Sequence, residues 1–229
     1  MSELRFPLPS TTVAMLLADA RLPSGGHAHS GGLEPALRGG MQVSDVPDFL
    51  MARARSTCLV EAGTAVVARH LALVDPAGLH YVVHAWAART PSNVLRDAAR
   101  HLGRGYLRLA RHLWPSSELL VEIASWDRPP PRSVVLGVIA AEAGMDPADL
   151  VRLVIYDETA SAAAALLKLE PRDPAEVTGW VLRVCAALDD AVDGVAVIVD
   201  PAAIPAAGAP QAEGWAQAHA LLTQRLFRA

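Results

Sequence analysis

Lysine is nearly absent from this 229-residue sequence. Lys168 is the only lysine among 20 basic residues, and the other 19 are arginines. The 24 acidic residues outnumber them and leave a net charge of -4. An acidic chain of this kind is a poor general binder of nucleic acid or of anionic membranes. Any chemistry that needs a lysine amine has one candidate.

Cysteine and long apolar runs are also scarce. Cys58 and Cys185 lie far apart without a C-x-x-C pair, so neither a zinc knuckle nor a disulfide framework is expected. The first ten residues contain Glu3 and polar breaks where a signal peptide needs an uninterrupted apolar region. The longest apolar runs, such as 134–141, end at a charge well short of a membrane span. We therefore expect a soluble, cytoplasmic chain.

Aromatic residues make up only 5% of the sequence, whereas alanine and leucine are abundant, and this balance favours helix over strand. Apolar periodicity predicts helices over 11–21, 45–73, 79–88, 92–113, 133–144, 147–168 and 174–193. Residues 195–199 could form a single strand. We expect an all-α, single-domain helical bundle over 1–199. A flexible linker rich in Pro, Ala and Gly over 200–214 and a flexible C-terminal tail over 215–229 would follow it.

Two histidine pairs could contribute ligands to a metal ion. His27 and His29 are separated by one residue, and His80 and His84 would share one face of a helix. Neither pair has a third ligand at an adjacent spacing, so we predict ordinary histidines and no metal or cofactor site. A metal-binding module that uses His27 and His29, completed by a second subunit, stays open as an alternative.

An acidic motif offers a second alternative. Asp189, Asp190 and Asp193 fit the D-D-x-x-D pattern with which all-α prenyl-diphosphate enzymes hold Mg²⁺. No second acidic motif accompanies it, and one lysine offers little for a diphosphate. A solvated helix end is the more economical interpretation, and no arrangement of residues supports nucleophilic catalysis.

Two segments look suited to binding other proteins. Helix 92–113 carries five arginines on the side opposite its apolar residues, at positions 96, 100, 104, 108 and 111. This face is either solvated or a docking face for an acidic partner, because guanidinium groups pair with carboxylates through two hydrogen bonds. Leu226 and Phe227 lie near the chain end. Leaving them exposed would forgo about 2 kcal/mol of burial each, so we expect a partner to bury them.

Three motifs, in order and in register over most of the chain, resemble the UreF family of urease accessory proteins. The segment L-P-S-G-G-H-A-H-S-G-G-L-E is similar to the family's N-terminal motif and contains Pro23, Gly25, Ser30, Gly32, Leu33 and Glu34. A central A-R-T, L-R and L-G-R series contains Arg89, Arg96, Gly103 and Arg104. The terminal motif contains His219 followed by Arg225, Leu226, Phe227 and Arg228.

Several positions depart from the family pattern. Histidines 27 and 29 stand where the family usually has aromatics, which resembles an actinobacterial variant. A further motif begins at Tyr156, and in it Ser161 and Lys168 replace the usual asparagine and arginine. Ala220 follows the tail histidine where a glutamate is common.

The resemblance implies an all-α chaperone, often a homodimer, that is not an enzyme. With a UreD/UreH-type scaffold and the GTPase UreG it would act on apo-urease, promoting GTP-dependent nickel insertion and recruiting and regulating the GTPase. His219 and residues 225–228 would contact the UreD-type partner. The 22–34 loop and the 89–104 segment would support either the fold or the complex, and both possibilities remain open.

Overall fold

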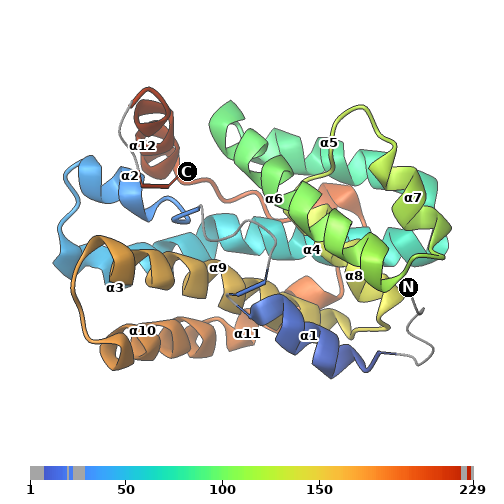
Figure 1. Cartoon of the computed structure of the whole chain (residues 1–229), viewed down its shortest axis with the longest axis horizontal. Helices are drawn as coiled ribbons and strands as arrows, with labels where there is room; N and C mark the ends of the chain where they lie inside the picture. Colours follow the sequence, from blue (N-terminus) through green and yellow to red (C-terminus); the bar gives the residue numbers. More distant parts are fainter. Residues whose placement is uncertain (1–7, 20, 23–28, 223–225, 228–229) are drawn as a thin grey trace.

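The computed structural model describes residues 8–19, 21–22, 29–222 and 226–227, and within these ranges all regular structure is helical (Figure 1). The all-α prediction is confirmed. The α-helices are α1 (Ser10–Ala18), α2 (Leu33–Arg38), α3 (Val46–Arg53), α4 (Leu59–Val74), α5 (Leu79–Arg89), α6 (Asn93–Leu113), α7 (Glu118–Ala124), α8 (Arg132–Glu142), α9 (Pro147–Leu169), α10 (Pro174–Ala187), α11 (Asp189–Ala196) and α12 (Pro210–Ala220).

Several element boundaries differ from the prediction. The helix expected over 45–73 is two helices joined by a π-helical turn, Ala54–Cys58, and the one expected over 174–193 breaks at Leu188. The prediction of a strand over 195–199 was wrong, because α11 continues to Ala196 and no strand follows in the described residues. Helix α7 was missed. Helix α12 begins at Pro210, inside the segment expected to be a linker, since proline suits the first turn of a helix.

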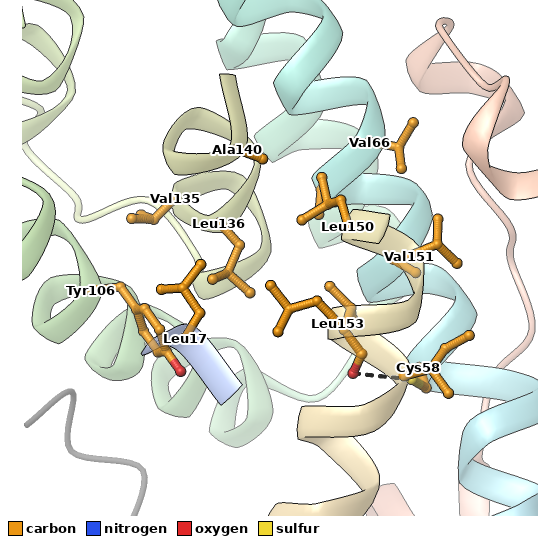
Figure 2. Packing of buried hydrophobic residues seen from close by; sticks show 14 of the residues in the cluster. Leu17, Cys58, Val66, Tyr106, Val135, Leu136, Ala140, Leu150, Val151 and Leu153 are labelled. Carbon is orange, nitrogen blue, oxygen red and sulfur yellow. Dashed lines mark hydrogen bonds between the residues drawn. The ribbon is translucent and has the colours of Figure 1, made fainter. Parts of the chain in front are cut away.

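Helix α4 forms the centre of the bundle, packed against α5, α8 and α9. At Gly137 of α8 an added Cβ would lie 2.3 Å from the carbonyl oxygen of Ala65, so only glycine permits this approach of α8 to α4. Figure 2 shows leucines 136, 150 and 153 meeting between α8 and α9, with Val66 of α4 nearby. This core fixes the positions of the helices that carry the motifs.

One stretch in the described part of the chain, Val43–Val74, is long and apolar enough to cross a membrane. The same property is found in the core helices of globular proteins. Half of its most apolar window is buried inside the fold, and its α4 portion packs against α5, α8 and α9. Its apolar character is therefore accounted for by the protein core.

Helix α6 packs through small residues and Tyr106. An added Cβ at Gly103 would lie 2.1 Å from the carbonyl oxygen of Pro130, so the motif glycine lets α6 lie directly against the segment that leads into α8. Tyr106, Leu107 and Ala110 complete its buried face. The buried face thus matches the predicted apolar pattern only at Tyr106, because Leu109 and Leu113 are half-buried and Leu107 and Ala110 are covered instead.

Candidate docking site around the C-terminal segment

The N-terminal motif forms a tight turn ahead of α2. Gly31 and Gly32 have φ values of 60° and 83°, in the left-handed region that glycine enters without strain. Ser30 is buried, and its hydroxyl accepts a hydrogen bond from the N–H of Glu34 at 3.2 Å. The turn places Glu34, which is only 1% exposed, in the first turn of α2.

Glu34 binds the C-terminal segment through the main chain. Its Oε1 accepts a hydrogen bond from the N–H of Leu226 at 3.0 Å, and its Oε2 accepts one from the N–H of Phe227 at 2.8 Å. Arg38, one turn along α2, donates from Nε to Oε1 at 3.0 Å. The N-terminal and C-terminal motifs, about 190 residues apart in sequence, therefore meet at one carboxylate. We call this contact the Glu34 clamp.

The clamp keeps Glu34 ionised. Burial alone would favour the neutral acid, but the N–H groups of Leu226 and Phe227, the Arg38 guanidinium and the nearby His219 hold the pKa of Glu34 below its ordinary value. His219 Nε2 lies 3.2 Å from Glu34 Oε2. The carboxylate thus accepts hydrogen bonds from α2 and the C-terminal segment, and His219 of α12 lies at ion-pair distance.

The two apolar side chains of the C-terminal motif have opposite environments. Phe227 is 3% exposed, and the ammonium group of Lys168 lies 5.5 Å from the centre of its ring, a cation–π distance. Leu226 is 61% exposed. The expectation that both would need a partner for burial was wrong for Phe227, because the protein's own body buries it. The single lysine therefore has a contact within the fold.

Helix α12 fixes the approach of the C-terminal segment to α2 (Figure 1). Its Trp215 covers Gly39, where an added Cβ would lie 2.4 Å from the indole ring. Gln217 donates from Nε2 to Ser92 Oγ at 3.1 Å and to Asn93 Oδ1 at 2.9 Å at the start of α6. His219 is 3% exposed. Helix α12 is thus tied to both α2 and α6.

A cavity of about 200 Å³ lies beside Phe227. Residues from many parts of the chain line it: the N-terminal turn with α3 and α4, the end of α5, helix α6, the start of α8, helix α9, and the region of α12 with Phe227. Its lining includes Gly31, Glu61, Tyr106, Glu158, Lys168 and Phe227. Residues from all three family-like motifs, and Lys168 from the motif on α9, thus line the same cavity.

A buried ionic network forms one wall of this cavity, and the sequence analysis did not find it. Arg53 bonds to Glu158 and to the carbonyl oxygen of Gly31, while Arg132 bonds to both Asp157 and Glu158. Charged residues within otherwise apolar helices were the available signal. The network links α3, α8, α9 and the N-terminal turn.

The pKa values of the acids in this wall are shifted in different directions. Burial favours neutral Glu158, but Arg132 and Arg53 outweigh it and lower the pKa of this carboxyl. Burial raises the pKa of Asp157 despite Arg132, and burial together with the charge of Glu158 raises that of Glu61. Trp86 donates to Glu61 Oε1 at 2.8 Å. Glu158, between its two arginines, is thus the acid of this wall whose charged form the protein stabilises most.

The central motif residues mostly serve local structure. Arg89 donates to the carbonyl oxygens of Ala202 and Ile204, both at 2.9 Å, and so holds the segment before α12. Arg96 donates to the carbonyl oxygens of Thr90 and Pro91 at the start of its own helix. Arg104 and Tyr156 are exposed. Arg89 and Arg96 therefore support the fold, whereas the exposed pair is available to other molecules.

The remaining candidates do not assemble into a site. Within the described ranges no group of three or more potential metal ligands is found, and His80 stacks on Trp126 at 4.1 Å between ring centres. The His29 ring lies 5.9 Å from that of His101. Five predicted positions lie outside the described residues: Pro23, Gly25, His27, Arg225 and Arg228.

The D-D-x-x-D motif lies on the surface. Asp189, Asp190 and Asp193 are exposed in α11 and are not part of the cavity lining, and Asp189 accepts a hydrogen bond from Arg152 at 3.2 Å. This arrangement matches the solvated helix end and gives the prenyl-diphosphate alternative no support.

Comparison with known proteins identifies relatives along most of the chain. The UreF family model matches residues 42–185. A urease accessory protein UreF from Mycobacterium marinum is 39% identical over 202 residues, which covers 83% of this chain and 90% of the relative. The Mycobacterium tuberculosis protein of the same description is 37% identical over 204 residues, covering 85% and 91% respectively. One from Mycobacterium sp. strain JLS is 35% identical over 183 residues.

Proposed function

Because the chain belongs to the UreF family of urease accessory proteins, we propose that it is a cytoplasmic assembly chaperone for urease. It would join a UreD/UreH-type scaffold and a UreG-type GTPase on apo-urease and promote GTP-dependent nickel insertion, recruiting and regulating the GTPase. In this role it is a homodimer and not an enzyme, and nickel is cargo of the complex.

The Glu34 clamp is the observation that carries this proposal. It joins the N-terminal and C-terminal family motifs at one place in the fold. Phe227 anchors the segment, and Leu226 beside it remains 61% exposed. An exposed leucine held on a fixed main chain is a suitable anchor for a partner, because its burial there costs little conformational entropy. We assign this surface to the UreD-type scaffold.

The first prediction concerns Leu226. Leu226→Asp should abolish co-purification with the UreD-type partner, because a charge would replace the exposed anchor, whereas the main-chain N–H that Glu34 binds is retained. Helical circular dichroism and Tm should not change. Leu182→Asp on α10, where the leucine is 60% exposed, is the matched control and should bind normally.

Deletion of residues 225–229 should have the same effect on binding, with the helical signal preserved. Undiminished binding by both variants would refute the assignment of this surface. The wider proposal has its own test: expression of this chain in urease-positive cells that lack their UreF-type gene should restore nickel content and activity of urease, and failure to restore either would contradict it.

A further inference from the structure

The cavity beside Phe227 contains a hydroxyl group without a partner. Thr57 lines this cavity, and its Oγ1 is buried and makes no hydrogen bond among the residues that the structure describes. Threonines 64, 159 and 178 differ from it, because each donates to the carbonyl oxygen four residues earlier at 2.7–2.8 Å. Buried polar groups are normally hydrogen-bonded, so the exception at Thr57 needs a physical cause.

The π-helical turn Ala54–Cys58 supplies that cause. In a π-helix the backbone hydrogen bonds run to the fifth residue instead of the fourth, which changes how a side chain is placed relative to the carbonyl group one turn before it. On this turn Ser56 donates to the carbonyl oxygens of Ala52 at 2.7 Å and of Arg53 at 3.4 Å, whereas Thr57 has no such bond. Turns of this kind inside helices are frequent at functional sites.

The charged side chains near Thr57 already neutralise one another. Arg53 and Arg132 share Glu158, and Arg132 also bonds to Asp157. Basic and acidic side chains line the whole cavity in nearly equal numbers. Among the described residues no group of three or more potential metal ligands is found. The cavity therefore offers a neutral hydrogen-bonding group at Thr57 and no excess of charge that would favour an ion.

The apolar part of the cavity suits a group about as large as one ring. Aliphatic side chains of α4, α6 and α9 line it together with the Phe227 ring, namely Val60, Leu95, Ala98, Leu102, Ala164 and Ala165. An apolar cavity of about 150 Å³ can bind benzene, and this one measures about 200 Å³. Water needs about two to four polar partners, so it is poorly held against these side chains.

We propose that this cavity binds a small neutral molecule that carries a hydrogen-bonding head on a ring-sized apolar body. The head, a carboxamide or a hydroxyl group, pairs with Thr57 Oγ1, which can both donate and accept. The body packs among the side chains of α6 and α9 and the Phe227 ring. Because Phe227 forms part of the lining, a bound molecule also favours the docked position of the C-terminal segment.

The test uses the full-length protein and two probes, benzamide and toluene, which share a ring but differ in the carboxamide head. Methyl NMR signals of Leu95 and Leu102 should shift saturably with both probes, and benzamide should bind more tightly. Thr57→Val keeps the shape of the side chain and removes the hydroxyl. It should weaken benzamide binding about two- to tenfold, the range for one neutral hydrogen bond, and leave toluene binding unchanged.

Two further variants serve as controls. Ser56→Ala removes a neighbouring hydroxyl that does not line the cavity, and it should bind both probes like the wild type. Ala98→Leu fills part of the cavity and should abolish binding of both probes. Tm should not fall in Thr57→Val, because the hydroxyl that is removed is buried and unpaired, and circular dichroism would confirm that every variant folds.

Saturable binding of neither probe would overturn the proposal and leave water as the occupant of the cavity. Toluene binding as tight as that of benzamide, or benzamide binding that is unchanged in Thr57→Val, would contradict the role of the hydroxyl. Binding that persists in Ala98→Leu would place the probe elsewhere and equally exclude this site. The assay uses no urease partner, so its failure would leave the proposed function intact.

Discussion

At the scale of single residues, the sequence singled out the positions that meet at the Glu34 clamp but did not predict that they meet. Glu34 and Phe227 each stood out by motif, yet hydrogen bonds between a carboxylate and main-chain N–H groups almost 200 residues away leave no periodic signal. The partly exposed Lys168 was placed by resemblance alone, and its contact with the Phe227 ring depends on tertiary packing. Local patterns therefore predicted which residues matter, and the fold decided what they do.

Glu34→Gln should weaken the clamp. An amide keeps one acceptor but directs an N–H₂ donor at the N–H of Leu226 or Phe227, so a charge-assisted hydrogen bond is lost at a cost of about 1.5–3 kcal/mol. Urea denaturation would measure the loss of global stability in this variant, and hydrogen exchange at residues 226 and 227 would measure the weaker attachment of the C-terminal segment. Arg38→Gln removes only the exposed partner of Glu34 and should cost less than about 0.5 kcal/mol. Equal losses in both variants would contradict this account.

The same carboxylate should make tail docking sensitive to acid. Its pKa is lowered in the folded state, so the stabilisation is fully present above the unfolded pKa, about 4.3. This stabilisation is lost as the pH falls through the lower pKa that Glu34 has in the folded state. Protection of the 226 and 227 amides, corrected for intrinsic exchange, should therefore disappear at acidic pH in the wild type. In Glu34→Gln the protection should be lower and independent of pH over this range.

At the scale of elements, helices were predicted correctly where apolar periodicity was strong. Their ends were misplaced where tertiary packing determines the point at which a helix stops. The break between α10 and α11 occurs at Leu188, which is 2% exposed and would suit a continuous helix by propensity. The π-helical turn before α4 adds one residue per turn and shifts the faces of α3 and α4 relative to each other. Neither feature has a signature in a single sequence.

Gly103→Ala tests the closest approach of α6 to its neighbours. The new methyl group would meet the Pro130 carbonyl oxygen at 2.1 Å, and the required shift of α6 should cost about 1–3 kcal/mol. Thermal unfolding would measure the loss. Gly179→Ala on α10 is the matched control, because no atom lies within 4 Å of its added Cβ. It should stabilise the protein by up to about 1 kcal/mol, and a similar loss in both variants would exclude the proposed close contact as the cause.

At the scale of the whole molecule, composition and apolar periodicity predicted an all-α protein, whereas its internal electrostatics required the structure. Arg53 and Arg132 come from helices far apart in sequence and share Glu158. The network connects the N-terminal turn, α3, α8 and α9, so one glutamate supports the whole wall of the cavity beside Phe227.

Glu158→Gln should therefore destabilise the entire fold. Two arginines, 7% and 18% exposed, would lose a shared countercharge, and removal of one partner from a buried ion pair costs about 3–5 kcal/mol. Urea denaturation would show a lower midpoint with an unchanged slope. Glu170→Gln, at the exposed end of the same helix, should leave the midpoint within error of the wild type. A small effect at Glu158 would indicate that water already compensates the two guanidinium groups.

The Glu34 clamp also constrains how this protein can vary during evolution. Glu34 binds peptide N–H groups, which every residue except proline possesses, so the side chain at position 226 is not specified by the clamp. That position can follow changes in a partner's surface without loss of tail docking. Glu34 has no such freedom, because no other side chain has the same length and charge. With Leu226 in its proposed partner-binding role, we expect relatives to vary at position 226 while they keep Glu34 and lack proline at 226 and 227.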